Sequence, residues 1–165
     1  MIYREAIIED LENVWNKDIR ENPNDDRWIR WKKEYIKHNE EGNLKTFVAV
    51  NDDNDVIAQI SVVFSSKVKC VKGKRKLCDD KRICNMNAFR CDEEYEGQGH
   101  ISKLVKMGEE YARNKGYKYI TIGSEARETR NLSIYFHFGY KTFLMYEIDE
   151  SEEDKPLVLY YGKNL

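Results

Sequence analysis

The segment from Ile83 to Lys115 constrains the fold of this chain more than any other part of the sequence. It begins with the strand-like run ICNMNAFRC, continues through the loop DEEYEGQGH, and ends in a run whose apolar face comprises Ile101, Leu104, Val105, Gly108, Tyr111 and Ala112. Gly116 follows at the position where helices commonly stop. The sequence therefore predicts a strand, a glycine-containing loop, and an amphipathic helix over 101–115.

The loop in this segment has the composition of an anion-binding site. Gly97, Gln98 and Gly99 lie immediately before the predicted helix. Glycines allow the backbone to turn sharply and to approach a ligand closely. The first turn of a helix leaves N–H groups without intrahelical partners, and the helix dipole adds partial positive charge there. Together these features bind phosphate oxygens, although two glycines alone more often serve only the geometry of a loop.

The remaining pattern predicts an α/β (α+β) chain. Hydrophobic periodicity and turn residues predict a strand at 2–6, helices over 7–19 and from Trp28 to near Gly42, strands at 46–50, 56–64 and 119–122, a short helix at 131–138, and strands at 141–148 and 157–161. Strands grouped early and alternating with helices later indicate a mixed sheet with helices on both faces. Without an internal repeat or linker, we expect one domain over residues 1–165. The basic stretch 65–82 is expected to be a solvated hairpin connection.

Composition limits the possible partners. The 165 residues are 41% hydrophobic and 35% charged with a net charge of −2, which suits a globular domain and gives no reason to expect nucleic acid or an anionic membrane as a partner. Charges interrupt the apolar runs of MIYREAIIEDLENVW, and no run approaches the roughly 20 apolar residues of a membrane span. A soluble, cytoplasmic protein is expected.

The four cysteines do not predict a metal site. Cys70, Cys78, Cys84 and Cys91 have irregular spacings and no CxxC pair, so no metal is expected. Cys84 and Cys91 lie in an apolar run and are expected to be buried thiols. A clip formed by Cys70 and Cys78 stays open as an unusual alternative.

Two longer motifs carry a family resemblance. The stretch EEYEGQGHISKLVKMGEEYARNKGYKYITIG resembles the coenzyme A-binding motif of the GNAT N-acetyltransferase superfamily, and NLSIYFHFGYKTF resembles the family's next signature. They occur in the family's order with one strand between them, and the resemblance covers nearly the whole chain. It implies a mixed, mostly antiparallel sheet of about seven strands with helices on both faces. It also implies an enzyme that transfers acetyl from acetyl-CoA to a primary amine of a small molecule or peptide by direct attack.

The family's loop pattern is Gln or Arg, two residues, Gly, one residue, then Gly or Ala. In this chain Gly99 matches that pattern, whereas Glu96 and Ile101 depart from it. We expect Glu96 to face solvent and Ile101 to hold the helix slightly farther from the phosphates, so that coenzyme A binding is retained but weaker. His100 either donates to phosphate or, more commonly for a loop histidine, faces water. The resemblance assigns this part of cofactor binding to Gly97, Gln98, Gly99, His100, Ile101 and Ser102.

The same resemblance assigns the reacting end of the cofactor. The strand that ends at Phe89, Arg90 and Cys91 would separate from its neighbour, pair with pantetheine, and polarise the acetyl carbonyl through a backbone N–H. Tyr135 matches the family's general acid near the sulfur, and its phenol, with an ordinary pKa of about 10, is protonated at neutral pH. Asn131 matches the asparagine that caps the short helix and touches the cofactor. Simple packing of Tyr135 and simple capping by Asn131 remain the alternatives.

The base and the acceptor site are less constrained. Glu125 is the best candidate for the base, directly or through a water, with Asn85 and Asn87 placed to hold that water or the acceptor. Trp28 is the candidate substrate contact on the first two helices, where an aromatic stripe is more often core. Asp25 and Asp26 cap the second helix or favour a cationic acceptor. The basic stretch 67–82 would instead favour an anionic acceptor or the adenosine 3′-phosphate.

Two other functions stay open at this stage. A catalytically silent acyl-CoA sensor on the same fold is compatible with the departures at Glu96 and Ile101. A nucleic-acid module using the basic stretch 67–82 is disfavoured, because that stretch lacks interleaved aromatic residues and the net charge is acidic. By resemblance to the family, a homodimer is a further possibility.

Overall fold

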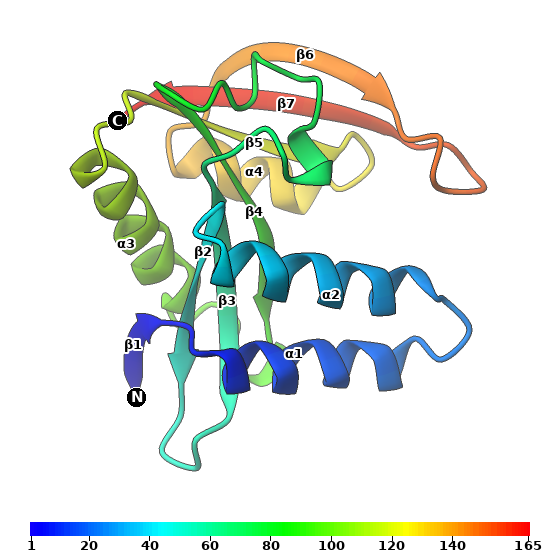
Figure 1. Cartoon of the computed structure of the whole chain (residues 1–165), viewed down its shortest axis with the longest axis vertical. Coiled ribbons are helices and arrows are strands. Elements are labelled where there is room, and N and C mark those ends of the chain that lie inside the picture. Colours follow the sequence, from blue (N-terminus) through cyan, green and yellow to red (C-terminus); the bar gives the residue numbers. More distant parts are fainter. The chain divides into compact units, whose positions relative to one another are not determined.

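The computed structural model describes residues 1–165 and has the predicted order of elements. In chain order these are β1 Ile2–Glu5, α1 Ile8–Glu21, α2 Arg27–Glu40, β2 Leu44–Val50, β3 Val56–Val63, β4 Ile83–Cys91, α3 His100–Asn114, β5 Tyr119–Glu125, α4 Thr129–His137, β6 Thr142–Ile148 and β7 Leu157–Asn164 (Figure 1). Short 3-10 turns lie at Lys69–Val71 and Glu93–Tyr95.

The strands form one seven-stranded, mostly antiparallel sheet, as predicted. Their order is β1-β2-β3-β4-β5-β7-β6. The pairs β1–β2, β2–β3, β5–β7 and β6–β7 are antiparallel, and β4–β5 is parallel. The chain divides into two compact units: unit 1 comprises residues 1–63 and 88–108, and unit 2 comprises residues 64–87 and 109–165. Each unit is described by itself below.

In unit 1, helices α1 and α2 lie side by side and antiparallel (Figure 1). The apolar residues of α1 recur at intervals of three and four, so that Leu11, Val14 and Trp15 share a buried face. Tyr35 of α2 packs on Trp15 with 5.1 Å between ring centroids. This aromatic contact joins the two helices.

Unit 2 is built around β5. Ile120 and Ile122 of this strand are fully buried. On the opposite face, the Tyr160 ring of β7 covers Gly123, where an added Cβ would lie 2.5 Å from a ring carbon. Helix α4 ends at His137, two residues before Gly139, whose φ of +92° suits glycine, and Tyr140 N–H donates to Tyr135 O (3.0 Å). The terminus of α4 is therefore closed by a six-to-one backbone bond that fixes its last turn.

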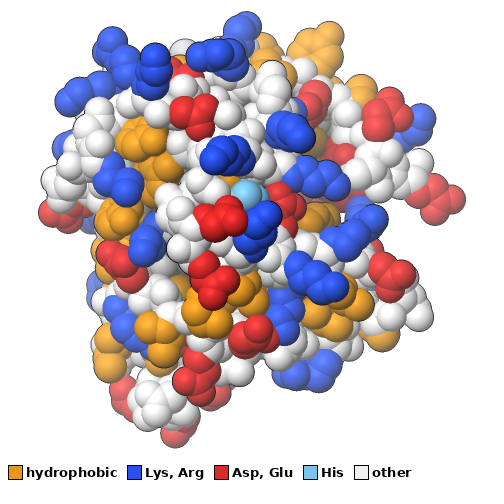
Figure 2. Space-filling model, in the orientation of Figure 1, with side chains coloured by type: hydrophobic (Ala, Val, Ile, Leu, Met, Phe, Trp, Pro, Cys, Tyr) orange, Lys and Arg blue, Asp and Glu red, His pale blue; other side chains and the backbone are white.

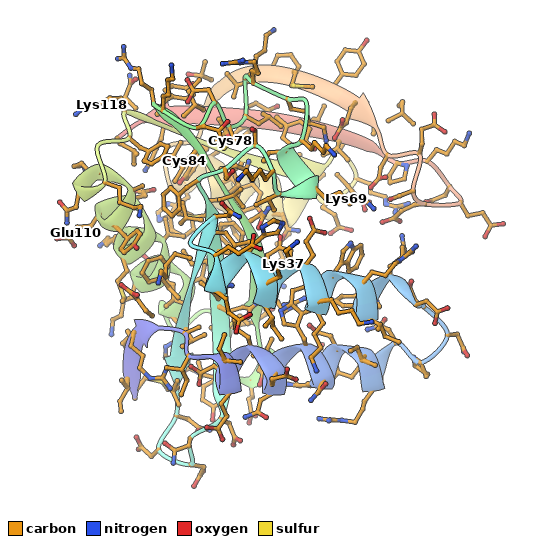
Figure 3. All side chains as sticks on the ribbon, in the orientation of Figure 1. Lys37, Lys69, Cys78, Cys84, Glu110 and Lys118 are labelled. Atoms are coloured by element: carbon orange, nitrogen blue, oxygen red, sulfur yellow. The ribbon has the colours of Figure 1, made fainter.

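The basic stretch 65–82 is not a solvated hairpin, and that prediction is wrong. Val68, Val71, Leu77 and Cys78 are buried at intervals along it, while Lys69, labelled in Figure 3, is exposed. Thr121 Oγ1 of β5 donates to Leu77 O (2.8 Å). The apolar residues between the lysines pack the stretch into unit 2, of which it is part, and its basic composition did not indicate this.

Several boundaries and burials differ from the sequence expectations. Strands β5 and β7 extend to Glu125 and Asn164 because they pair continuously from Tyr119–Asn164 to Glu125–Val158. Cys84 is fully buried, as predicted, but Cys91 is only partly buried. None of the four cysteines forms a disulfide, and no group of three or more His, Cys, Asp or Glu side chains is arranged to hold a metal ion.

The face shown in Figure 2 carries both signs of charge, with Lys and Arg interspersed with Asp and Glu. None of the helices is both long and apolar enough to cross a membrane.

Candidate active site

The predicted phosphate-binding loop is exposed and built on two left-handed glycines. Gly97 and Gly99 have φ values of +73° and +84°, a region that L side chains avoid, and an added Cβ at either would meet no atom within 4 Å. Gln98 is exposed, and its Nε2 donates to Glu94 O (2.8 Å). Helix α3 begins at His100, directly after this turn. Glycine is required here because the backbone turn has positive φ, and not because a side chain would clash with a neighbour.

His100 does not face water, so that part of the prediction is wrong. Its side chain is 8% exposed, and its Nδ1 is hydrogen-bonded to the Tyr3 hydroxyl (2.7 Å). The two rings stack with 5.9 Å between centroids, and Tyr95 contacts the imidazole edge-on at 6.0 Å. The imidazole therefore anchors the start of α3 to β1 through Nδ1, while its buried Nε2 has no hydrogen-bond partner.

The two departures from the family pattern have different surroundings. Glu96 is exposed, as predicted, whereas Ile101 is half-buried on the first turn of α3. Ser102 is also half-buried. The departures at Glu96 and Ile101 change side chains only, so the main-chain N–H donors of the turn are kept.

The end of β4 contains a backbone feature that sequence reasoning missed. Ala88 has a φ of +54°, an uncommon conformation for a residue with a side chain. Gln59 of β3, itself buried, donates from Nε2 to Ala88 O (3.4 Å). Strained backbone of this kind concentrates at functional sites, and Phe89 to Cys91 follow immediately. Alanine carries no sequence signal for a left-handed residue.

The Arg90 side chain lies between aromatic rings. Its guanidinium carbon is 4.0 Å from the Trp15 ring centroid and 5.5 Å from that of Trp28, and Nη2 forms an ion pair with Asp18 (2.8 Å). Burial raises the pKa of the Asp18 carboxyl, while Arg90 opposes that rise. Trp28, the predicted substrate contact, is half-buried and also packs edge-on against Trp31 at 5.1 Å. Trp28 thus participates in the α1–α2 aromatic packing.

Asp25 binds a cation supplied by its own chain. Both carboxylate oxygens accept hydrogen bonds from the Arg27 guanidinium, at 2.8–3.1 Å. Oδ1 also accepts from the N–H of Arg27 (3.0 Å), the first residue of α2, whose N-cap residue is Asp26. The hydrogen bond from the Arg27 side chain lowers the pKa of Asp25 to about 2. Arg27 therefore already balances the charge of the Asp25 carboxylate, which leaves it less able to bind an external cation.

In unit 2, Tyr135 is a buried phenol on α4. Its side chain is 7% exposed, and burial raises the pKa of the phenol to about 12. The proton therefore stays on the oxygen at neutral pH. Tyr135 is the only predicted site residue in unit 2 whose side chain lies in the hydrophobic core.

Asn131 is not the cap of α4, contrary to the prediction. The helix begins at Thr129 with Glu128 in the N-cap position, so Asn131 lies within the first turn. Glu125 is the last residue of β5, and its Oε2 accepts a hydrogen bond from Arg127 Nε (2.5 Å). Arg127 also forms an ion pair with Asp154. The predicted base is thus held within a charge network at the end of β5.

Asn85 and Asn87 form a connected polar row on β4. Asn85 Nδ2 donates to Thr121 Oγ1 (2.9 Å), and Asn87 Nδ2 donates to Asn85 Oδ1 (3.3 Å) and to Cys70 Sγ (3.1 Å). The predicted site residues fall into two groups. Unit 1 contains the 97–102 loop, the end of β4 and Trp28, and unit 2 contains Asn87, Glu125, Asn131 and Tyr135.

Comparisons with known proteins place these features in a family. Residues 5–140 match the sequence model described as the acetyltransferase (GNAT) family. No curated protein matches the sequence significantly. Among solved structures, a ribosomal-protein-alanine N-acetyltransferase from Brucella melitensis is 14% identical, with a TM-score of 0.72 and 100% coverage of both chains.

Two further structures are similar at comparable identity. A mutant of the spermidine N-acetyltransferase from Vibrio cholerae is 13% identical with a TM-score of 0.68, covering 99% of this chain and 95% of the other. An aminoglycoside 6′-N-acetyltransferase complexed with coenzyme A is 12% identical with a TM-score of 0.66, covering 99% and 97%. At these identities the structural similarity concerns the fold.

Proposed function

Because the chain belongs to the GNAT family of acetyltransferases, we propose that it transfers acetyl from acetyl-CoA to a primary amine of a small molecule or peptide. The observation that carries this proposal is the exposed Gly97–Gly99 turn at the start of α3, within the matched region. Similar structures include enzymes named for spermidine, aminoglycoside and protein alanine acetylation, which share an amine acceptor. The whole chain would act as one acetyltransferase domain.

The residues of the loop fit a pyrophosphate. The turn is solvent-exposed, and the first turn of α3 follows it with N–H groups that lack intrahelical acceptors. Gly97, Gln98, Gly99, His100, Ile101 and Ser102 would bind the phosphates through their main-chain donors, supported by the helix dipole. The anchoring of His100 to Tyr3 favours a pre-formed loop, which lowers the entropy cost of binding. No metal is required in this proposal.

The transfer follows from the chemistry of the thioester. The neutral amine attacks the acetyl carbonyl carbon, the C–N bond forms, and the carbonyl oxygen gains negative charge that an N–H from Phe89, Arg90 or Cys91 would stabilise. The C–S bond then breaks, and the departing thiolate takes the phenolic proton of Tyr135. The amine loses its own proton to Glu125, directly or through a water. Asn131 would contact the cofactor, and Asn87 and Trp28 the acceptor.

A second copy of this chain is the proposed partner. Strand β6 lies at the edge of the sheet, and Phe143, Tyr146 and Ile148 on it are exposed together with Leu157 of the paired strand β7. Exposed apolar patches of this kind commonly lie at protein interfaces. Light scattering should therefore find a dimer that Tyr146→Lys disrupts, whereas a monomeric native protein would contradict the dimer.

The experiment that tests the function measures acetyl-CoA consumption across a panel of diverse amines, together with calorimetric titration of acetyl-CoA. Turnover with at least one amine, lost in Tyr135→Phe while acetyl-CoA still binds, is the expected result. Binding without turnover for any amine would support the acyl-CoA sensor instead. If no acyl-CoA binds, both functions are overturned.

A further inference from the structure

Five residues of unit 2 form a polar cluster that the reaction described above does not use in full. The Glu147 cluster comprises Cys70, Lys74, Asn87, Glu147 and Tyr160. Glu147 Oε1 accepts hydrogen bonds from Tyr160 OH (2.5 Å) and from Lys74 Nζ (2.6 Å). Lys74 Nζ also donates to Cys70 O (3.2 Å), and Asn87 reaches Cys70 Sγ (3.1 Å). The cluster therefore connects the 65–82 stretch with β4, β6 and β7.

The cluster lies where the pairing of β4 with β5 ends. The paired register runs from Ile83–Tyr119 to Met86–Ile122, and Asn87 and Gly123 are the next residues on the two strands. The Tyr160 ring covers Gly123, and Asn87 belongs to the cluster through Cys70. Where two neighbouring strands inside a sheet stop pairing, a ligand can bind between them. The cluster thus borders that point.

Lys74 shows what the cluster binds. Its ammonium group has a carboxylate at 2.6 Å, a backbone carbonyl at 3.2 Å, and the Tyr160 ring centroid at 5.7 Å. A carboxylate, a carbonyl and an aromatic ring together are the partners that a primary ammonium prefers. The side chains of Lys74 and Glu147 are 24% and 28% exposed, so solvent reaches both.

Tyr160 fixes the orientation of the Glu147 carboxylate. Its hydroxyl donates to the same oxygen that binds Lys74, and this orients Glu147 across the β6–β7 pair. Burial, followed by the Glu147 contact, raises the pKa of the Tyr160 phenol far above its ordinary value, so it remains a donor. The neighbouring Lys72 and Lys76 are exposed on the same stretch. Lys74, unlike these two neighbours, is therefore half-buried at the Glu147 carboxylate.

We infer that Glu147 and Tyr160 form the subsite that first binds the acceptor's primary ammonium, before it gives a proton to solvent and becomes the neutral nucleophile, and that Lys74 occupies this subsite until the acceptor displaces it. The inference rests on the proposed acetyl transfer for the fate of the amine, but the binding itself does not. It selects cationic aliphatic amines as the acceptor class. It also assigns cation recognition to Glu147. Asp25, the candidate from the sequence, is already paired with Arg27.

Steady-state kinetics with the best amine of the panel test this subsite through opposite effects. Glu147→Gln should raise KM for the amine at least about 10-fold, because an ammonium loses its charged partner. Tyr160→Phe should raise it about 3- to 10-fold. Lys74→Met should lower it by about 3-fold or more, because an internal competitor that reduces the binding-competent fraction is gone. KM for acetyl-CoA and kcat should change by less than about 3-fold in all three variants.

Lys76→Met and Glu153→Gln are the matched controls, since both residues are exposed and lie outside the cluster. If the Lys74–Glu147 pair has a purely structural role, Lys74→Met and Glu147→Gln should both raise KM for the amine. That outcome overturns the inference. Unchanged amine KM in Glu147→Gln overturns it as well.

Calorimetry with putrescine separates this inference from the proposed function. Putrescine that binds the wild type, binds Lys74→Met more tightly, and fails to bind Glu147→Gln supports the subsite even if no acetyl transfer is ever detected. If acetyl transfer is detected but putrescine binds the wild type, Lys74→Met and Glu147→Gln with equal affinity, the proposed function stands and the subsite is overturned.

Discussion

The proposed phosphate-binding loop of unit 1 and the proposed catalytic helix α4 of unit 2 represent two different ways of building a site. The loop is exposed, its donors are main-chain N–H groups, and its shape depends on Gly97 and Gly99 at positive φ. Helix α4 instead contributes one buried side chain, that of Tyr135, whose carbonyl accepts the hydrogen bond that closes the helix C-terminus. A site made of backbone tolerates changes of side chain, such as Glu96 and Ile101. A site made of one side chain does not.

The largest effect should follow from removing the phenol of α4. Tyr135→Phe should lower kcat by about 100-fold or more, because general acid catalysis typically contributes that much. Acetyl-CoA affinity measured by calorimetry should change by less than about 2-fold, because the loop is untouched. An unchanged kcat under saturating substrates would remove Tyr135 from the mechanism.

The pKa of Tyr135 adds a pH test to the same variant. Since burial raises this pKa to about 12, the phenol keeps its proton throughout neutral and moderately alkaline solution. Wild-type kcat should therefore show no loss from this group as the pH rises to about 10. A descending limb that disappears in Tyr135→Phe would contradict the raised pKa.

The second effect concerns the side chains that hold α4 in unit 2. Lys163 Nζ donates to Phe138 O at the end of α4 (2.8 Å) and pairs with Glu109 (2.7 Å), which also accepts from Tyr140 OH (2.9 Å). Lys163→Met would leave the Glu109 carboxylate, only 11% exposed, without its counter-ion. The free energy of unfolding should fall by on the order of 2 kcal/mol, about 4–8 °C in Tm.

Lys155→Met is the control for this prediction, since the Lys155–Glu150 pair is exposed on both sides. Removing an exposed pair should cost less than about 1 kcal/mol. Equal effects of the two substitutions in thermal unfolding would mean that the Lys163 contacts are no more than a surface pair.

A smaller effect is expected when the glycine conformation of the loop is disturbed. Gly99→Ala places a side chain at a φ of +84°, which costs about 1–2 kcal/mol if the loop keeps its shape. Acetyl-CoA affinity should fall roughly 5- to 30-fold, with kcat at saturation nearly unchanged. Gly73→Ala is the matched control, because Gly73 has a φ of +78° and lies outside the loop. A loss of affinity in Gly73→Ala but not in Gly99→Ala would place the cofactor elsewhere.

The comparison also explains how much the sequence could predict. The order of elements was predictable because apolar periodicity is local, and the 97–99 turn was predictable because glycine at a turn has a local cause. Ala88 was not, since its φ of +54° is held by Gln59 from another strand. The burial of His100 depends on Tyr3, which lies 97 residues earlier in the chain, and only the fold brings them together.

The role of the basic stretch was missed for the same physical reason. Its lysines dominate the composition, but Val68, Val71 and Leu77 decide where it lies. No local pattern indicates that Lys74 reaches Glu147, because the partner lies 73 residues later on β6. Long-range polar pairs of this kind become visible only when the strands have been assembled.

The smallest effect tests the tolerance of the backbone-built loop most directly. Glu96 is exposed, so its negative charge is screened by water and its removal should do little. Glu96→Gln should tighten acetyl-CoA binding by no more than about 3-fold at low salt, with the difference shrinking as salt is added. If Glu96→Gln instead improves binding by 10-fold or more in calorimetry, the carboxylate lies against the phosphates. The loop would then depend on its side chains as α4 depends on Tyr135, and the distinction between the two regions would fail.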